Sequence, residues 1–217
     1  MSTSLPDDLA LSTTYIPSTG NTYSVVYGCS PSQAKSLEKR LRSAGRHMSH
    51  PLLPAGIFAE LERERLIAAA EDLVDKFARC SNFSENTKWN PNSSQIGDYF
   101  AICVKSRNLV DQIRAVKRQL ISFVEELGVL DEQWRFQLHR YHPDIGNLSD
   151  QTSEKKRPNQ LQNALETGER ITRRLTEIAV EYDDKIDECE MIAQNLPLAM
   201  QTVRNPTLGL SFLTCTC

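Results

Sequence analysis

No long hydrophobic run occurs in the sequence. The longest apolar stretches, LISFV at 120–124 and LGLSFL at 208–213, are far shorter than the roughly 18 to 20 residues that a helix needs to cross a bilayer. The opening segment, MSTSLPDDLALSTTY, contains two aspartates and no basic residue, which fits neither a secretory signal nor an Arg-rich transit peptide. These absences predict a cytoplasmic chain without a transmembrane segment.

The sequence also lacks the features of nucleic-acid-binding proteins, of disulfide-stabilised proteins and of enzymes with common catalytic motifs. Lys and Arg number 25 against 28 Asp and Glu, so the net charge of −3 offers no overall positive field to hold nucleic acid. The six cysteines are irregularly spaced and follow no signal sequence, which indicates reduced thiols rather than a disulfide framework. No G-x-S-x-G, P-loop, G-x-G-x-x-G or H-E-x-x-H motif occurs, which favours a structural or regulatory role over catalysis.

The chain has enough apolar residues to fold, and its first 29 residues are the only part with strand character. It is 217 residues long and 40% hydrophobic, which is sufficient for a buried core. Residues 11–16 and 22–27 are rich in Thr, Tyr, Val and Ile and flank a turn at 17–21, a pattern that predicts one β-hairpin. Two strands alone are marginally stable, so we interpret the hairpin as the remnant of a larger sheet.

A short helix with a basic face is predicted next. Ser30 suits the N-cap, Pro31 the first helical position and Gln33 the capping box, while Gly45 suits the far end. Residues 35–46 carry a net charge of +4, the one basic patch of the chain. A solvated helix face is the simplest interpretation, and an acidic partner or an anionic lipid surface is the alternative.

Long amphipathic helices separated by polar segments are predicted for the rest of the chain. Apolar residues recur there at spacings of three and four. We expect Gly128 to end one helix and Pro197 to kink or end the last one. The predicted order is a helical region at 30–141 with helices at 57–80 and 95–127, a polar loop at 81–94 and a short piece at 131–141, then a linker at 142–157, a long helix at 158–203 and a tail at 204–217.

Two of these helices carry apolar seams with nearly heptad spacing. Spacings of three and four that repeat over many turns keep one stripe facing a partner helix. The fold class predicted is therefore mainly α, an elongated bundle of long antiparallel helices with a small N-terminal β-hairpin. The seam residues expected to mediate association are Leu109, Ile113, Val116, Leu120, Ile171, Leu175, Ile178 and Ile186.

Two groups of polar residues are candidate metal ligands. Seven acids and one lysine lie between 177 and 190, and oxygen ligands of this kind suit Mg²⁺ or Ca²⁺. A solvated acidic face and pairing with the basic helix are the alternatives. Two His-x-x-His pairs, at 47/50 and 139/142, are each followed by proline, which disfavours the helical geometry that a zinc site would need. The acidic candidates are Glu181, Asp184, Asp187 and Glu188.

Two sequence blocks carry a family resemblance. The run TYSVVYGCSPSQAKSLEKRL…HPLLPAGIFAELERERL at 22–66 and the run ERITRRLTEIAVEYDDKIDECEMIAQNLPLAMQ at 169–201 resemble the cytosolic part of fungal CorA-like magnesium transporters. The order and separation of the two blocks also agree with that family. The resemblance implies an α/β cytosolic domain and long helices that descend as a stalk toward two membrane helices, the first of which ends in Gly-Met-Asn.

The sequence departs from that family where transport would reside. It contains no Gly-Met-Asn, and after Gln201 it reads TVRNPTLGLSFLTCTC without a membrane segment. We therefore transfer architecture and not transport. Our hypothesis is that 204–217 is a non-homologous end, produced by a retained intron, an altered gene model or a truncating mutation.

The expected function follows from the seams and the resemblance. We expect a soluble cytosolic fragment, similar to the stalk domain of a CorA-like transporter, that associates with itself or with membrane-bound relatives through its helices. One alternative is a regulatory domain that senses Mg²⁺ through the acidic face, with Mg²⁺ as its cofactor. Another is a generic coiled-coil interaction protein. A further alternative is weak contact of the basic helix with anionic membranes.

Overall fold

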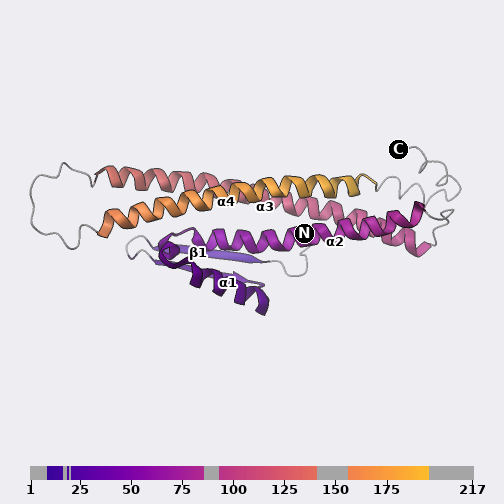
Figure 1. Ribbon diagram of the computed structural model, residues 1–217, viewed down its shortest axis with the longest axis horizontal. Helices are drawn as coiled ribbons and strands as arrows, with labels where there is room; N and C mark the ends of the chain where they lie inside the picture. The colour runs from indigo at the N-terminus through magenta and orange to yellow at the C-terminus, as the bar shows by residue number, and fades with distance from the viewer. Residues whose placement is uncertain (1–8, 17–18, 20, 86–92, 141–155, 196–217) are drawn as a thin grey trace, which may run out of the picture. The chain divides into compact units, whose positions relative to one another are not determined.

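A computed structural model describes residues 9–16, 19, 21–85, 93–140 and 156–195. The described chain is mainly helical, with four α-helices and one two-stranded hairpin, which confirms the predicted fold class (Figure 1). Among the described helices, none contains a segment that is both long and apolar enough for a bilayer crossing. The elements are β1 (Ala10–Ile16), β2 (Asn21–Tyr27), α1 (Pro31–Ala44), the 3₁₀ helix η1 (Gly45–Ser49), α2 (Leu53–Glu85), α3 (Ser93–Arg140) and α4 (Lys156–Ala193).

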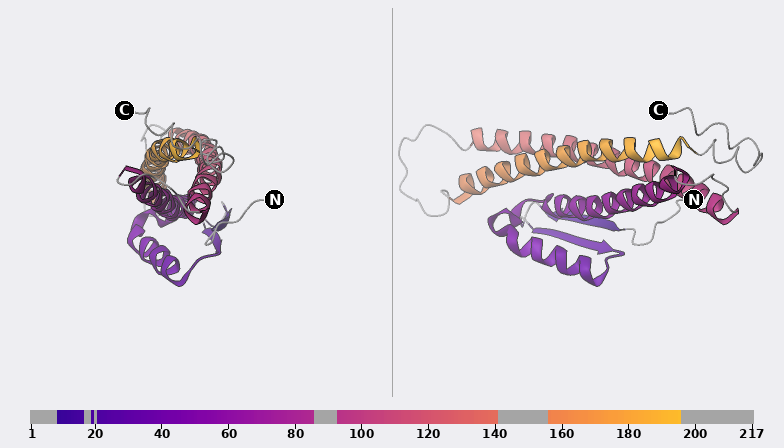
Figure 2. Two further views of the ribbon diagram at one scale, coloured as in Figure 1. Left: turned by 90° about the vertical axis from the view of Figure 1, so that its right-hand side faces the viewer. Right: turned by 45° about the vertical axis from the view of Figure 1, so that its right-hand side comes forward.

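The chain divides into two units, and α2, α3 and α4 each contribute a segment to both. The first unit comprises Met1–Arg63 and Gln119–Ala179, and the second comprises Glu64–Arg118 and Val180–Cys217. Within each unit the three helix segments lie side by side (Figure 2). The helical cores are therefore built from segments that are far apart in the sequence.

Specific contacts give the helix directions. In the first unit α2 and α4 run parallel, since Gly56 lies against Ile171 and Glu60 pairs with Arg174 one turn further on. In the second unit α3 and α4 run antiparallel, because Ser106 bonds Cys189 whereas Lys117 pairs with Asp183. An up-and-down order of three consecutive helices produces these directions.

The hairpin forms where the strand pattern predicts it. β1 and β2 pair antiparallel from Ala10 opposite Tyr27 to Ile16 opposite Asn21. Exposed and half-buried residues alternate strictly along β1, as expected for a sheet with one wet face. On β2 the side chains of Tyr23, Val25 and Tyr27 share one face and are all more than half exposed.

Helix α1 has the predicted termini. The Gln33 N–H donates to Ser30 Oγ at 3.3 Å, and the Ser30 N–H donates to Gln33 Oε1 at 2.8 Å, which completes the capping box. Gly45 ends the helix with a φ of 51°, a value that glycine adopts without strain. No residue of α1 is buried, so its apolar side chains are covered only in part.

The structure corrects the predicted bounds of the long helices. α3 continues through Gly128, and the adjacent Leu127 is fully buried. A helical glycine costs only about 1 kcal/mol relative to alanine, and packing of that kind offsets it. The segment between α2 and α3 is shorter than the predicted loop at 81–94, because α2 extends to Glu85 and α3 begins at Ser93.

The last helix is shorter than its apolar pattern indicates. α4 begins at Lys156, which places Pro158 in the first turn, and it ends at Ala193 instead of continuing to 203. Residues 194 and 195 form a turn. The predicted linker at 142–157 lies almost entirely outside the described residues, as do Pro197 and the tail at 204–217.

Candidate functional site

The predicted seam residues are the core of the chain itself. Seven of the eight are buried, and Val116 is half-buried. Because segments of one chain already cover these side chains, association with another chain must use different residues. The first unit contains Leu120, Ile171, Leu175 and Ile178, and the second contains Leu109, Ile113, Val116 and Ile186.

Buried groups in the second unit strengthen the packing of α3 on α4. Ser106 Oγ donates to the Cys189 carbonyl oxygen at 2.7 Å, and both residues are completely buried. Burial raises the pKa of the Cys189 and Cys103 thiols, which keeps both protonated and weakly nucleophilic at neutral pH. These cysteines therefore serve as small core residues.

Several acidic residues of α4 form ion pairs with different basic residues. Glu188 accepts hydrogen bonds from Lys185 at 2.9 and 3.2 Å, and this bond raises the lysine pKa. Asp183 pairs with Lys117 of α3, and Glu190 pairs with Arg114 of the same helix. α3, and not the basic helix α1, thus supplies cations to these two acids.

The metal candidates do not converge. Asp184 and Asp187 are exposed, whereas Glu181 and Glu188 are half-buried. Among the described residues, no group of three or more His, Cys, Asp or Glu side chains is placed to hold a metal ion. Hard cations need several oxygen ligands from different directions, and one helix face does not provide them.

A row of exposed apolar side chains on α3 was missed from the sequence. Ile121, Val129 and Phe136 of the first unit are 45%, 57% and 64% exposed. Spacings of 8 and 7 place them within about 80° of one another around the helix axis, and we call this group the α3 outer row. The prediction that Gly128 ends the helix concealed this pattern, since it assigned Phe136 to a separate element.

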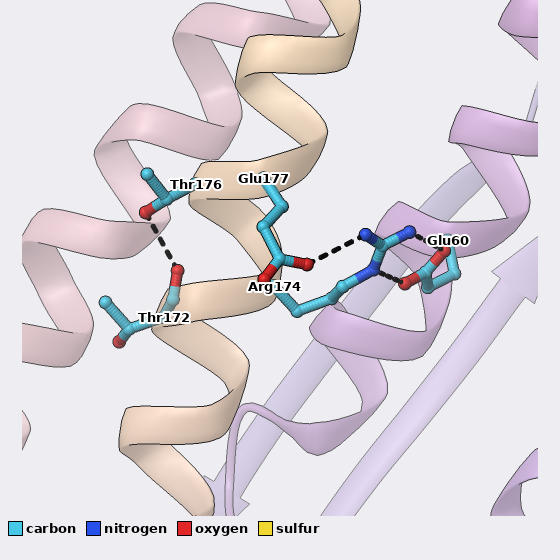
Figure 3. Close-up of polar contacts among 5 residues, drawn as sticks. All are labelled: Glu60, Thr172, Arg174, Thr176 and Glu177. Atoms are coloured by element: carbon cyan, nitrogen blue, oxygen red, sulfur yellow. Dashed lines mark hydrogen bonds and ion pairs between the residues drawn. The ribbon is translucent and has the colours of Figure 1, made fainter.

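A two-point ion pair joins α2 to α4 in the first unit. Arg174 Nε donates to Glu60 Oε1, and Nη2 donates to Glu60 Oε2 at 3.2 Å (Figure 3). Arg174 Nη1 also donates to Glu177 Oε2 at 3.0 Å. The guanidinium fork matches a carboxylate in this geometry, so the pair fixes the register of the two parallel helices.

His47 belongs to a directed chain of hydrogen bonds beside this pair. The Thr167 hydroxyl donates to the Asn163 carbonyl at 2.7 Å, so it accepts from His47 Nδ1, also at 2.7 Å. His47 Nε2 lies 3.2 Å from Arg170 Nη1 and accepts from it. This arrangement assigns His47 as a neutral ring with its proton on Nδ1.

His50 has the opposite tautomer and different surroundings. It is completely buried, packs edge-to-face on Trp134 at a centroid distance of 5.2 Å, and accepts the Leu52 N–H at Nδ1. Its proton is therefore on Nε2, and burial lowers its pKa to about 4. The two histidines thus make separate contacts instead of forming a zinc pair. Of the second pair, His142 and the His139 side chain lie outside the described residues.

The comparisons with known proteins give no function. No family model matches the chain, and no curated protein or solved structure gives a significant match. The function must therefore be argued from the contacts and surfaces described above.

Proposed function

We propose that this chain is a helix–helix association module, similar to the cytosolic stalk of CorA-like cation transporters. The proposal assigns association, and not ion conduction, to these residues. The observation that carries it is the α3 outer row, in which Ile121, Val129 and Phe136 remain exposed on a helix whose opposite face is buried. Apolar side chains in a row on an outer helix face are typical of a surface that another helix covers.

The Glu60–Arg174 pair joins the two sequence blocks from which the proposal starts. Glu60 lies in the block at 22–66, and Arg174 lies in the block at 169–201. The two blocks therefore contact each other through a bidentate ion pair in the first unit.

The partner that we propose for the α3 outer row is a second copy of the chain, and a membrane-bound CorA-like relative is the alternative. Burying a fully exposed Val, Ile or Phe side chain contributes about 1.5 to 3 kcal/mol. The three residues of the row are 45 to 64% exposed, so each contributes about half of that to an interface. Lost translational and rotational freedom offsets part of this gain, which favours reversible association that depends on concentration.

Light scattering and sedimentation of the full chain test the proposal. We expect a mass above the 24.5 kDa of one chain that falls on dilution. Val129→Glu with Phe136→Glu should give a monomer with unchanged helicity, since both side chains are exposed. Gln119→Glu is the matched control, because Gln119 is an exposed residue of the same helix and its spacing of two from Ile121 places it on a different face.

Two results would contradict self-association. One is a wild-type monomer at every concentration, and the other is equal dissociation by the control. If the wild type is monomeric but binds a full-length CorA-like protein through the same row, the alternative partner is correct.

A further inference from the structure

The first unit contains a cavity of about 370 Å³ that association through the α3 outer row does not use. Its walls come from α1, η1, the first turns of α2 and the middle of α4. Arg40, Arg170 and Arg174 line it together with a single carboxylate, Glu60. Three arginines and one carboxylate therefore line this cavity.

The arginines of the cavity are balanced unequally. Arg174 pairs with two carboxylates, those of Glu60 and Glu177. Arg170 is exposed, and the hydrogen bond described for it goes to His47, whose ring is neutral in the assigned tautomer. That contact provides an acceptor for one N–H but no opposite charge. A guanidinium that faces an acceptor without negative charge attracts an anion, and its other N–H groups can bind that anion.

The remaining lining determines what kind of anion fits. The Ser43 and Thr167 hydroxyls already donate to backbone carbonyls, so the guanidinium N–H groups are the donors that a ligand meets. Leu53, Ile57 and Ile171 form apolar parts of the wall. The first turn of α2 also lines the cavity, and the positive end of a helix dipole favours negative charge nearby.

We propose that this cavity binds a phosphate monoester that carries a compact apolar group. Arg170 and Arg40 contact the phosphate, and the apolar wall holds the organic part. A volume of about 370 Å³ lies in the range of small-molecule sites. Phosphate of this kind occurs in soluble phosphate esters and in the headgroup of phosphatidic acid, and the site recognises the chemistry that both share.

Calorimetric titration of the full chain with phenyl phosphate tests the site. Wild type should bind at millimolar or lower concentration, and Arg170→Gln and Arg40→Gln should each weaken binding about tenfold through loss of a charge-assisted contact. Arg173→Gln and Lys39→Gln are the matched controls, since both residues are exposed neighbours on the same helices outside the cavity lining. We expect both controls to bind like wild type.

A second arm identifies the source of the phosphate. If the wild type floats with phosphatidic acid vesicles and Arg170→Gln does not, the ligand is the lipid headgroup. If the wild type binds phenyl phosphate but does not float with the vesicles, the ligand is a soluble ester. Absence of binding to both probes would overturn the proposal, as would equal loss of binding in the controls. Circular dichroism melts of all four variants establish that the comparison is made between folded chains.

Discussion

Arg174 of α4 binds Glu60 of α2 through two nitrogen atoms, and the same guanidinium reaches Glu177 one turn along its own helix. A side chain that makes all three contacts must be planar and forked, and lysine is neither. The pair is partly buried, with Glu60 only 20% exposed, so water screens it less than it screens a surface pair.

Arg174→Lys should therefore lower the free energy of unfolding by about 1 kcal/mol. Urea denaturation measures the change, and Arg173→Lys is the matched control because Arg173 is an exposed neighbour. Equal midpoints for the two variants would show that the fork contributes nothing measurable.

Two glycines should respond differently to alanine. A Cβ on Gly168 would lie 2.5 Å from Asp131 Oδ1, whereas a Cβ on Gly128 would meet no atom within 4 Å. Gly128→Ala should therefore stabilise the chain by about 1 kcal/mol through helix propensity. Gly168→Ala should lose that gain to the clash and recover it when combined with Asp131→Ala. Thermal unfolding of the three variants checks this, and equal gains at both glycines would contradict the close approach.

Nitrogen-15 NMR of the imidazole rings should distinguish the two histidines at neutral pH. We expect the proton on Nδ1 in His47 and on Nε2 in His50, because the hydrogen-bond partners differ. Thr167→Val should weaken the preference in His47, because only the Arg170 N–H donated to Nε2 then supports it, and should leave His50 unchanged. Finding the same tautomer in both rings would contradict the hydrogen-bond directions assigned to His47 and His50.

Acidification should destabilise the chain through His50. Its pKa falls from 6.5 to about 4 on folding, so the unfolded chain binds a proton that the folded chain resists. The stability that depends on the neutral ring is fully present above pH 6.5 and is lost as pH falls toward 4, to a total of about 3 kcal/mol. His50→Asn keeps an acceptor for the Leu52 N–H and should flatten the stability profile in this window. A variant profile as steep as that of the wild type would assign the effect to other groups.

Charge in the core should be far more damaging than charge on the α3 outer row. Ile113 and Ile178 are each completely buried, so Ile113→Asp or Ile178→Asp costs several kcal/mol and should unfold the chain. Val129→Asp places the same charge at a side chain that is 57% exposed and should leave helicity intact. Circular dichroism compares the three variants, and unchanged helicity in the two core variants would refute the buried seam.

Local signals predicted the fold well, and contacts between distant segments could not be predicted. The capping residues Ser30 and Gln33 and the heptad spacing of Ile171 to Ile186 act within a few turns, so the sequence displays them directly. Gly128 misled the prediction because buried neighbours decide whether a helix survives a glycine. The contact of Asp131 with Gly168 depends on how two helices meet, and no spacing in the sequence encodes it.

The candidate sites show the same division. The composition of the sequence showed the acidic cluster of α4. It did not show that these acids pair with Lys117, Arg114 and Lys185, because that depends on which side chains face them. The cavity brings Arg40 near Arg170 although they lie far apart in the sequence, and only the fold makes that juxtaposition.

The hairpin has a practical consequence for handling this protein. Within the described chain each strand has one neighbour, so the outer edge of each leaves N–H and C=O groups without a strand partner. One face of the hairpin also exposes a stripe of large apolar side chains, those of Tyr23, Val25 and Tyr27. Ribbons of this kind recruit extended peptides and seed fibrils in concentrated samples. A lysine introduced at Val25 would act as a gatekeeper against such polymerisation.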